Sequence, residues 1–543
     1  MSSTSFTRRS MLRTAGLGIV ATAAAGIFTG CSSADSNASL IANGAAKLPA
    51  YKPLTTTAPD LPPIQPTGLS GYFHFPKPFT SVEGKILTSG KPISILSRVS
   101  NAPYLPRERN PIQQWVEDRV GGQVNYLQIN DSDYAARFNT TIAGGNLPDV
   151  MNFVQVSNYP ALFEKRFTDL TPFLAGDKIA DYPNLAAIPT AMWKACTVGD
   201  KIYGLPLGRG GTSGLGTYHK EMFDAVGAYP STADEFAQIL QEATRPKSNV
   251  WGAVSSQGSA YNLRTYLQLF GAPFNWERKA DGSLVKDLET DAYKQAVEFA
   301  AKLFAAGVYH PNSNGPFRQV AAIFDNGQAA VSGDTITSLP QSIEIGSKIN
   351  PGTNPQALAA FSANPESKPV AYLDALTNSY SLVSKASEDR VREILRLANF
   401  TAAPLGSLEN VLMKYGKVGN TFDFDKNGGP VKRDQFSTTG APWGSLCQGS
   451  MSTYSAQYPE EVKAVYNGTK QLAPYFISDP TAGTYSPTDG SMGATLAQSF
   501  TDTCTSIIAG REPMSAFDDA VNKWRTGGGD KSRDEFQKAL GGK

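Results

Sequence analysis

The chain has few of the side chains that build metal clusters. Its 543 residues include three histidines and four cysteines, all widely separated, so no Cys/His metal cluster follows from local spacing. It also lacks an excess of either charge, since 49 Lys and Arg stand against 48 Asp and Glu. Proteins that bind a phosphate backbone normally carry a basic excess. Nucleic acid is therefore not an expected partner.

Familiar catalytic motifs are missing as well. The sequence contains no G-x-S-x-G nucleophile elbow, no H-E-x-x-H helix and no Walker loop. The glycine-rich run at 208–211 fails the G-x-G-x-x-G spacing because residue 213 is serine, and a flexible crossover explains its glycines better. Carboxylates are abundant, so a secreted carbohydrate-active enzyme, a glycosidase or lyase with a distant acid pair, stays open as an alternative function.

The first thirty residues have the pattern of an export signal. Charged residues at 7–13, including the pair Arg8–Arg9, precede a weakly apolar run at 15–28 and then Cys31. The arginine pair resembles a twin-arginine signal, and residues 28–31 resemble a bacterial lipobox. We therefore expect residues 1–30 to be removed and Cys31 to carry lipid, such as palmitate, which anchors the protein to the outer face of the cell membrane. The apolar run is too short to span that membrane.

The next segment is predicted to be a disordered tether. Residues 31–84 are rich in Ser, Ala, Thr and Pro and show no helical period. If Cys31 is consumed by lipid, three cysteines remain, which allows one intrachain disulfide at most. Cys447 with Cys504 is the pairing we favour, and the separation of their Cα atoms decides whether it can form.

From residue 91 onward, strand and helix patterns alternate, in a chain too long for one compact core. The predicted strands are 92–96, 124–129 and 149–154, and the helix between the last two is 133–143. A β-α-β-α-β order indicates a parallel sheet covered by helices. After the glycine-rich stretch 204–216 a second body follows, and its clearest helix is 291–306.

Several windows of the body, taken in order, resemble a known family. They are 137–150, 199–206, 230–236, 291–311 and 327–331, which include Gly144-Gly145-Asn146-Leu147-Pro148-Asp149 and Gly199-Asp200-Lys201-Ile202-Tyr203-Gly204. Together they resemble the family 1 extracellular solute-binding proteins of ABC importers, the mainly carbohydrate-binding group that includes maltose-binding protein. The resemblance covers most of residues 90–540, and residues 218–221 depart from the family's usual pattern.

The resemblance implies an α/β fold of the type II periplasmic-binding-protein class, the two-lobed Venus flytrap. Two parallel-sheet lobes are joined by several crossovers, and ligand lies in the cleft between them. Lobe one would hold 85–208 plus 375–440, and lobe two 209–374 plus 441–543. The implied function is not enzymatic: a lipid-anchored monomer captures an oligosaccharide outside the cell and delivers it to an ABC permease. A structural cell-surface lipoprotein is the third interpretation.

Two physical rules select candidate ligand contacts. An exposed indole in a loop offers a flat apolar face to a sugar ring and an N–H donor, which favours Trp276 and Trp443. Polar contacts are expected just beyond the carboxyl ends of parallel strands, where the crevice of an α/β sheet lies. That rule selects Arg98, Asp131, Asn152, Arg209 and Asp334.

Each of these residues also has a plainer interpretation. Asp131 suits a helix cap, Asn152 a buried amide, and the other charged residues a solvated surface, while either tryptophan can pack onto its own lobe. As ligand contacts, Arg and Asp would make charge-assisted hydrogen bonds to hydroxyls, and an Arg could instead pair bidentately with a uronate carboxylate.

One window matches a calcium-binding loop. Asp423, Asp425, Asn427 and Asp434 fit the D-x-D-x-N-G-x5-E pattern, with Asp in place of the final Glu. Against calcium, the flanks are not helical, Pro430 interrupts the loop, and Asn-Gly at 427–428 is a strong hairpin signal. The hairpin is the favoured interpretation and calcium the alternative; no other cofactor is expected.

Overall fold

The computed structural model describes residues 46–54, 58–77, 79–82, 84–99, 103–208, 214–373, 377–436, 439–449, 451–455 and 458–541. The proposed export signal, Cys31 and Arg209 lie outside these residues. None of the helices in the described part of the chain has the length and apolar character needed to cross a membrane.

Lobe one is built on a five-stranded sheet with the order β4-β3-β5-β16-β8. Three of its strands, β3 (Ile93–Val99), β4 (Val124–Asn130) and β5 (Val150–Asn152), are parallel, which confirms the predicted β-α-β-α-β unit. β16 (Thr377–Val383) runs antiparallel to both β5 and β8 (Gly204–Gly208). The distant segment after residue 377 therefore completes the sheet that the first 120 residues of the lobe begin.

Local sequence explains the helices of lobe one. α2 (Pro111–Val120) begins with proline at its first position, Asn110 accepts a hydrogen bond from the Gln113 N–H at 3.3 Å, and Gly121 ends the helix in the left-handed conformation. The other elements are α3 (Asp131–Gly144), α4 (Tyr159–Arg166), α5 (Thr171–Leu174), α6 (Pro183–Ala186), α7 (Thr190–Lys194), β6 (Thr197–Val198), β7 (Lys201–Ile202), α14 (Glu388–Thr401), α15 (Leu408–Lys414), β17 (Phe422–Phe424) and β18 (Pro430–Lys432).

Lobe two contains a four-stranded sheet with the order β10-β13-β9-β14. β10 (Trp251–Val254) is parallel to β13 (Ala329–Ser332), and β9 (Thr217–His219) runs antiparallel to β13 and to β14 (Pro355–Ala357). The predicted helix at 291–306 is α11 (Asp291–Ala305), which packs on α10 (Leu263–Phe270) and α17 (Ala494–Ile508). The remaining elements are α8 (Lys220–Asp224), α9 (Ala233–Ala243), β11 (Trp276–Arg278), β12 (Leu284–Lys286), α12 (Phe317–Asp325), α13 (Leu339–Ile349), α16 (Pro459–Leu472), α18 (Ser515–Trp524) and α19 (Asp530–Ala539).

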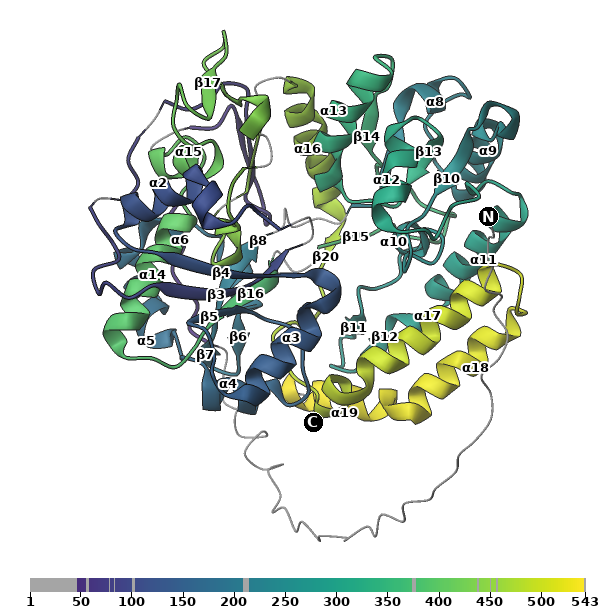
Figure 1. The fold of residues 1–543 in the computed structure, drawn as a ribbon. Coiled ribbons are helices and arrows are strands. Elements are labelled where there is room, and N and C mark those ends of the chain that lie inside the picture. Colours follow the sequence, from purple (N-terminus) through teal and green to yellow (C-terminus); the bar gives the residue numbers. More distant parts are fainter. Residues whose placement is uncertain are drawn as a thin grey trace, which may run out of the picture.

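Figure 1 shows the two lobes side by side, with the C-terminal helices α17, α18 and α19 wrapped along lobe two. The chain passes between the lobes at 208–214, at 373–377 and between 449 and 458. Two short strands lie at this junction, β15 (Ala371–Tyr372) and β20 (Phe476–Ile477), and they pair in parallel. The structure places Trp443, Leu446 and Cys447 in the hydrophobic core of lobe one, whereas the expected boundary at 441 assigns them to lobe two.

The expected tether is wrong for the part of it that the structure describes. Residues 46–82, which we call the N-terminal belt, contain β1 (Leu61–Ile64) and β2 (Leu69–Tyr72), and β2 pairs in parallel with β19 (Ser452–Tyr454). Leu69 is 3% exposed in the core of lobe two. The many prolines suggested disorder, but the belt's strand partner lies some 380 residues further on, where local sequence gives no sign of it.

The belt also contacts lobe one at both of its ends. Ala50 N donates to Gly176 O at 3.0 Å, and near the other end Ser81 Oγ donates to the Glu409 carboxylate at 2.8 Å. In lobe two, the Tyr466 hydroxyl donates to Pro62 O at 2.8 Å. The belt thus connects the lobes in addition to the three crossovers.

The favoured disulfide is wrong. Cys447 is buried in the core of lobe one and Cys504 in the core of lobe two, and both are free thiols, as is Cys196. The two residues belong to separately packed cores, so their sulfur atoms cannot meet.

Candidate functional site

The carboxyl ends of both sheets face the junction between the lobes. The chain leaves lobe one at the end of β8 and returns to it at the start of β16, which runs antiparallel, so both passages use the same edge of the lobe-one sheet. In lobe two the entering strand β9 is antiparallel to β13, so its start lies beside the end of β13. We call these two edges the interlobe face, and the strand-end rule places ligand contacts there.

Arg98 and Asp131 meet on the lobe-one side of this face. Arg98 is the penultimate residue of β3, and Asp131 is the first residue of α3, directly after β4. Arg98 Nε donates to Asp131 Oδ1 at 2.5 Å, and the two side chains are 41% and 36% exposed. Two of the residues selected by the strand-end rule therefore form one exposed donor–acceptor pair.

Asn152 is a buried residue that holds the main chain of Arg98 in place. It is 2% exposed, and its Oδ1 accepts a hydrogen bond from Arg98 N at 2.9 Å. Its Nδ2 donates to Ser445 O at 2.6 Å. Asn152 is thus a buried amide that fixes the end of β3, and any part it plays in binding passes through the position of Arg98.

Neither tryptophan offers an exposed indole. Trp276 begins β11, is 5% exposed, and packs against Trp524 and Phe536 with ring centroids 5.9 and 5.8 Å apart. Trp443 is 4% exposed, in a short 3₁₀ turn, and packs edge-to-face on Tyr126. The expectation of exposed loop indoles is wrong because distant segments supply apolar partners, which makes burial of so large a ring favourable.

An exposed aromatic on the lobe-one side is a tyrosine that the sequence did not single out. Tyr104 lies in the segment that follows β3, and its residue is 38% exposed. Its backbone N–H donates to Gln128 Oε1 at 2.8 Å, which fixes the main chain while the ring stays accessible. The strand-end rule would have found Tyr104 had it been applied to aromatic as well as charged residues.

On the lobe-two side, the loop after β10 is held in an unusual conformation. Ala260, Tyr261 and Asn262 all have positive φ, at 41°, 56° and 61°, which is unfavourable for residues other than glycine. Asn262 Nδ2 donates to Val254 O at 3.0 Å, and the Tyr309 hydroxyl donates to Tyr261 O at 2.7 Å. Such strain concentrates at binding sites, and no glycine in these positions pointed to it in the sequence.

Asp334 follows β13, as the strand-end rule requires, and is half-buried. Burial raises the pKa of its carboxyl above the usual range, although hydrogen bonds from Thr335 and Ser338 oppose that rise. Its Oδ1 accepts from Thr335 N at 2.7 Å, so part of its acceptor capacity serves the local turn.

Arg264, at the second position of α10, lies where the lobes join. Its guanidinium carbon is 5.3 Å from the ring centre of Phe274 and 5.2 Å from that of Tyr372, and these rings stack 4.8 Å apart. Gln268, one turn further along α10, donates to Gly214 O, the first described residue after the 208–214 crossover. α10 therefore carries an exposed arginine beside two of the three crossovers.

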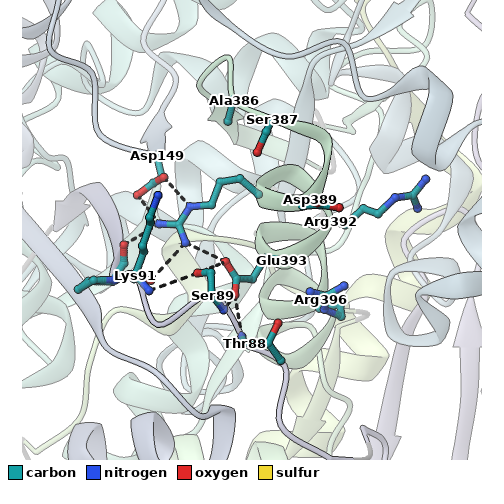
Figure 2. Close-up of a pocket in the computed structure, with 12 residues that line it drawn as sticks. Thr88, Ser89, Lys91, Asp149, Ala386, Ser387, Asp389, Arg392, Glu393 and Arg396 are labelled. Atoms are coloured by element: carbon teal, nitrogen blue, oxygen red, sulfur yellow. Dashed lines mark hydrogen bonds and ion pairs between the residues drawn. The ribbon is translucent and has the colours of Figure 1, made fainter.

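A pocket of about 680 Å³ lies at the other end of lobe one, near the start of β3 (Figure 2). Arg390 crosses it, donating to Asp149 and to Glu393, while Glu393 also accepts from Ser89. These groups satisfy one another, and the pocket is remote from the interlobe face. The residues that line it therefore form an ion-pair network that joins α14 to the sheet.

The calcium interpretation does not fit the structure. β17 and β18 form an antiparallel hairpin, in which Asp425 Oδ1 accepts from the N–H groups of Asn427 and Gly429 at 2.9 and 2.8 Å. Asp423 pairs with Arg433 at 2.7 Å. Across the described ranges no group of three or more His, Cys, Asp or Glu side chains is placed to hold a metal ion, so Asp423, Asp425, Asn427 and Asp434 do not assemble into a ligand set.

Two α/β lobes, joined by crossovers and facing each other with polar strand ends, define a two-lobed solute-binding protein. The chain belongs to the family of bacterial extracellular solute-binding proteins, whose family model matches residues 112–404. The predicted family and fold class are confirmed. Members of this family are binding proteins that work outside the cytoplasm, so the enzyme alternative is set aside.

The relatives have low sequence identity to this chain, but the similarity covers most of the length of both chains. The chain is 22% identical to the polygalacturonan/rhamnogalacturonan-binding protein YtcQ of Bacillus subtilis, over 78% of this chain and 87% of that protein. It is 23% identical to Lipoprotein LipO of Bacillus subtilis, over 80% and 90% of the two chains. The crystal structure of alginate-binding protein AlgQ2 superposes with a TM-score of 0.63 at 14% identity, covering 84% of this chain and 99% of that one.

Proposed function

We propose that this protein is the carbohydrate-binding component of an ABC importer. The observation that carries the proposal is the interlobe face of lobe one, where Arg98 and Asp131 form an exposed pair at the ends of β3 and β4 and where an exposed tyrosine, Tyr104, follows β3. Adjacent charged donor and acceptor groups suit sugar hydroxyls, and an aromatic ring suits the C–H face of a pyranose. Relatives whose names describe polysaccharide binding give independent support.

Delivery requires no reaction in the protein. A sugar that contacts both lobes favours the closed arrangement, and a permease that recognises this arrangement receives the ligand. Contacts from lobe two would come from Asp334 and the held loop at 260–262, and Arg209 would contribute from the crossover. The ligand is an oligosaccharide, and the protein acts as a monomer.

The anchoring part of the proposal rests on the N-terminal sequence. A twin-arginine-type signal would export the protein, and lipid on Cys31 would hold it at the outer face of the membrane. A relative named as a lipoprotein supports this arrangement. Metabolic labelling with a palmitate analogue tests it: label should appear on the wild-type chain and be absent from Cys31→Ser.

A thermal-shift screen against neutral and acidic oligosaccharides, followed by chromatography of each hit, tests the binding function. A receptor is stabilised by its sugar and returns it intact, whereas an enzyme returns products. Arg98→Ala should weaken binding of a hit by at least tenfold. Arg392→Ala is a matched control, because that arginine is also 41% exposed and also pairs with a carboxylate, but lies on α14. Unchanged binding by Arg98→Ala and Tyr104→Ala together would refute the proposed face.

A further inference from the structure

We propose that the interlobe face selects uronic acids, which are sugars that carry a carboxylate, and that the terminal amino groups of Arg98 bind this carboxylate. The inference rests on the proposed function, since it names the class of carbohydrate that the same face would bind. It adds a specificity determinant: Arg98 distinguishes an acidic sugar from its neutral counterpart.

The argument begins with how the Arg98 guanidinium is used. A guanidinium has five N–H donors in a planar fork, and Arg98 commits its Nε to Asp131 Oδ1 at 2.5 Å. Among the residues that the structure describes, the two terminal nitrogens of Arg98 have no hydrogen-bond partner. The edge formed by these two nitrogens matches the two oxygens of a carboxylate.

The position of this edge is fixed from two sides. Asp131 is held as the first residue of α3, where the positive end of the helix favours a carboxylate. The main chain of Arg98 is tied by Asn152, which is 2% exposed and bonded in turn to Ser445 O. A donor fork held in this way loses little conformational freedom on binding, which favours a planar, bidentate partner over a single hydroxyl.

Lobe two presents further positive charge to the same junction. Arg264 and Arg318 are both exposed and both stand at the second position of a helix, α10 and α12. The positive end of the helix dipole makes a cation unfavourable there. Arg264 is in addition held over the Phe274 and Tyr372 rings beside the crossovers. Arg318 lies close enough to Asp334 to oppose the burial-driven rise in the pKa of that carboxyl, so part of its charge is offset there, and the positive charge that lobe two adds to this face is chiefly that of Arg264.

The near-neutral charge of the whole chain does not argue against this conclusion. Selectivity depends on the local field at the binding face, and screening limits interactions between exposed charges to about 10 Å at ordinary ionic strength. Arg98 lies at the end of β3, Arg264 at the start of α10, the helix that follows β10, and Arg318 near Asp334, which follows β13. These are the elements that would surround a ligand at this face.

The test uses oligogalacturonates and alginate oligosaccharides as probes, each compared with its carboxyl-reduced, neutral form. Binding to the full chain is measured by calorimetry at low and high salt. We expect at least one acidic probe to bind at least tenfold more tightly than its reduced form, with an affinity that falls as salt rises. Arg98→Gln and Arg98→Lys should each weaken the acidic probe by tenfold or more, because neither retains the fork.

Arg392→Gln is the control and should bind the acidic probe like the wild type, and Arg98→Gln should unfold at the wild-type temperature. Equal binding of acidic and reduced probes, or normal binding by Arg98→Gln, overturns the inference. If only neutral sugars bind, the proposed function is supported and the inferred selectivity for acidic sugars is refuted. If no sugar of either kind binds, both are refuted.

Discussion

Arg390 donates two hydrogen bonds to the Asp149 carboxylate, from Nε to Oδ1 and from Nη2 to Oδ2, each at 3.0 Å (Figure 2). The pair joins α14 to the start of β5, and Ser94 on β3 donates to the same carboxylate at 2.8 Å. Burial would raise the pKa of Asp149, but the bonds from Arg390 and Ser94 outweigh it and hold that pKa below the usual range.

We therefore expect Asp149→Asn to destabilise the protein by about 1–3 kcal/mol, because it removes one of the two carboxylates that pair with the largely buried Arg390 and leaves only Glu393. Urea denaturation at pH 7 measures this loss. Arg392→Met is the control: its partner Glu388 is 67% exposed, so the change should be below about 0.5 kcal/mol. Equal effects of the two substitutions would contradict a structural role for the Arg390–Asp149 pair.

The same pair predicts a dependence on acid. A carboxyl whose pKa is depressed in the folded state stabilises the fold above its unfolded pKa, near 4, and that contribution is lost as pH falls further. Wild-type stability should therefore decline below pH 4 more steeply than that of Asp149→Asn. Denaturation curves between pH 3 and pH 6 check this, and parallel curves for the two proteins would count against it.

Glu461, at the start of α16, predicts the opposite trend. It is 7% exposed, and burial raises its pKa to about 7, with the charge of Glu344 adding to the rise and a hydrogen bond from Ser455 opposing it. The folded state therefore disfavours the charged form, so stability falls as pH rises from about 4.5 to about 7.

Glu461→Gln should accordingly stabilise the protein by about 3–4 kcal/mol at pH 8, from about 1.4 kcal/mol for each unit of the pKa rise, and by much less at pH 5. Unfolding at the two pH values measures the difference. Glu460→Gln is the neighbouring control, because that side chain is 70% exposed, and it should change stability little at either pH. A gain for Glu461→Gln that is the same at both values would contradict the raised pKa.

Features of the structure can be predicted from the sequence when the residues that determine them lie close together in the chain. The caps of α2 lie within a few residues of the helix they bound, and so its start at Asn110–Pro111 was predictable. Arg98 and Asp131 lie together because the carboxyl ends of parallel strands share one edge of the sheet, so their proximity could be predicted from topology. Both features follow from rules that need no knowledge of distant segments.

The failures involve partners far away in the chain. Trp276 is buried by Trp524 and Phe536, about 250 residues later, and β2 pairs with β19, about 380 residues later. No local pattern encodes these contacts, and a proline-rich segment or a loop tryptophan looks the same with or without such a partner. Tertiary packing decides both cases.

The belt makes a prediction that a tether does not. Leu69 is 3% exposed within the core of lobe two, so Leu69→Ala should destabilise the protein by about 2–5 kcal/mol through loss of burial and the cavity left behind. Chemical denaturation measures the change. Leu408→Ala, at a leucine that is 50% exposed, is the control and should cost little. If this segment were a disordered tether, Leu69→Ala would change the free energy of unfolding as little as the control does.

Because Trp276 and Trp443 are buried, we expect their substitution to affect stability and not ligand binding. Trp276→Ala and Trp443→Ala should each destabilise their lobe by about 3–5 kcal/mol, since both side chains are packed in a core. Trp276→Phe should restore much of the loss by refilling the site. Full wild-type stability in either alanine variant would show that the ring is not packed as described.

The three cysteines of the folded part should be unreactive thiols in the native protein. Burial raises the pKa of Cys504 to about 12 and raises the pKa of Cys196 and of Cys447 well above the ordinary value, so the reactive thiolate is scarce at neutral pH. In Cys31→Ser, which removes the lipidation cysteine, Ellman's reagent should titrate almost no thiol before unfolding and three thiols in urea. A single thiol in urea would reveal a disulfide, and rapid reaction of the native protein would show that a cysteine is accessible to the reagent.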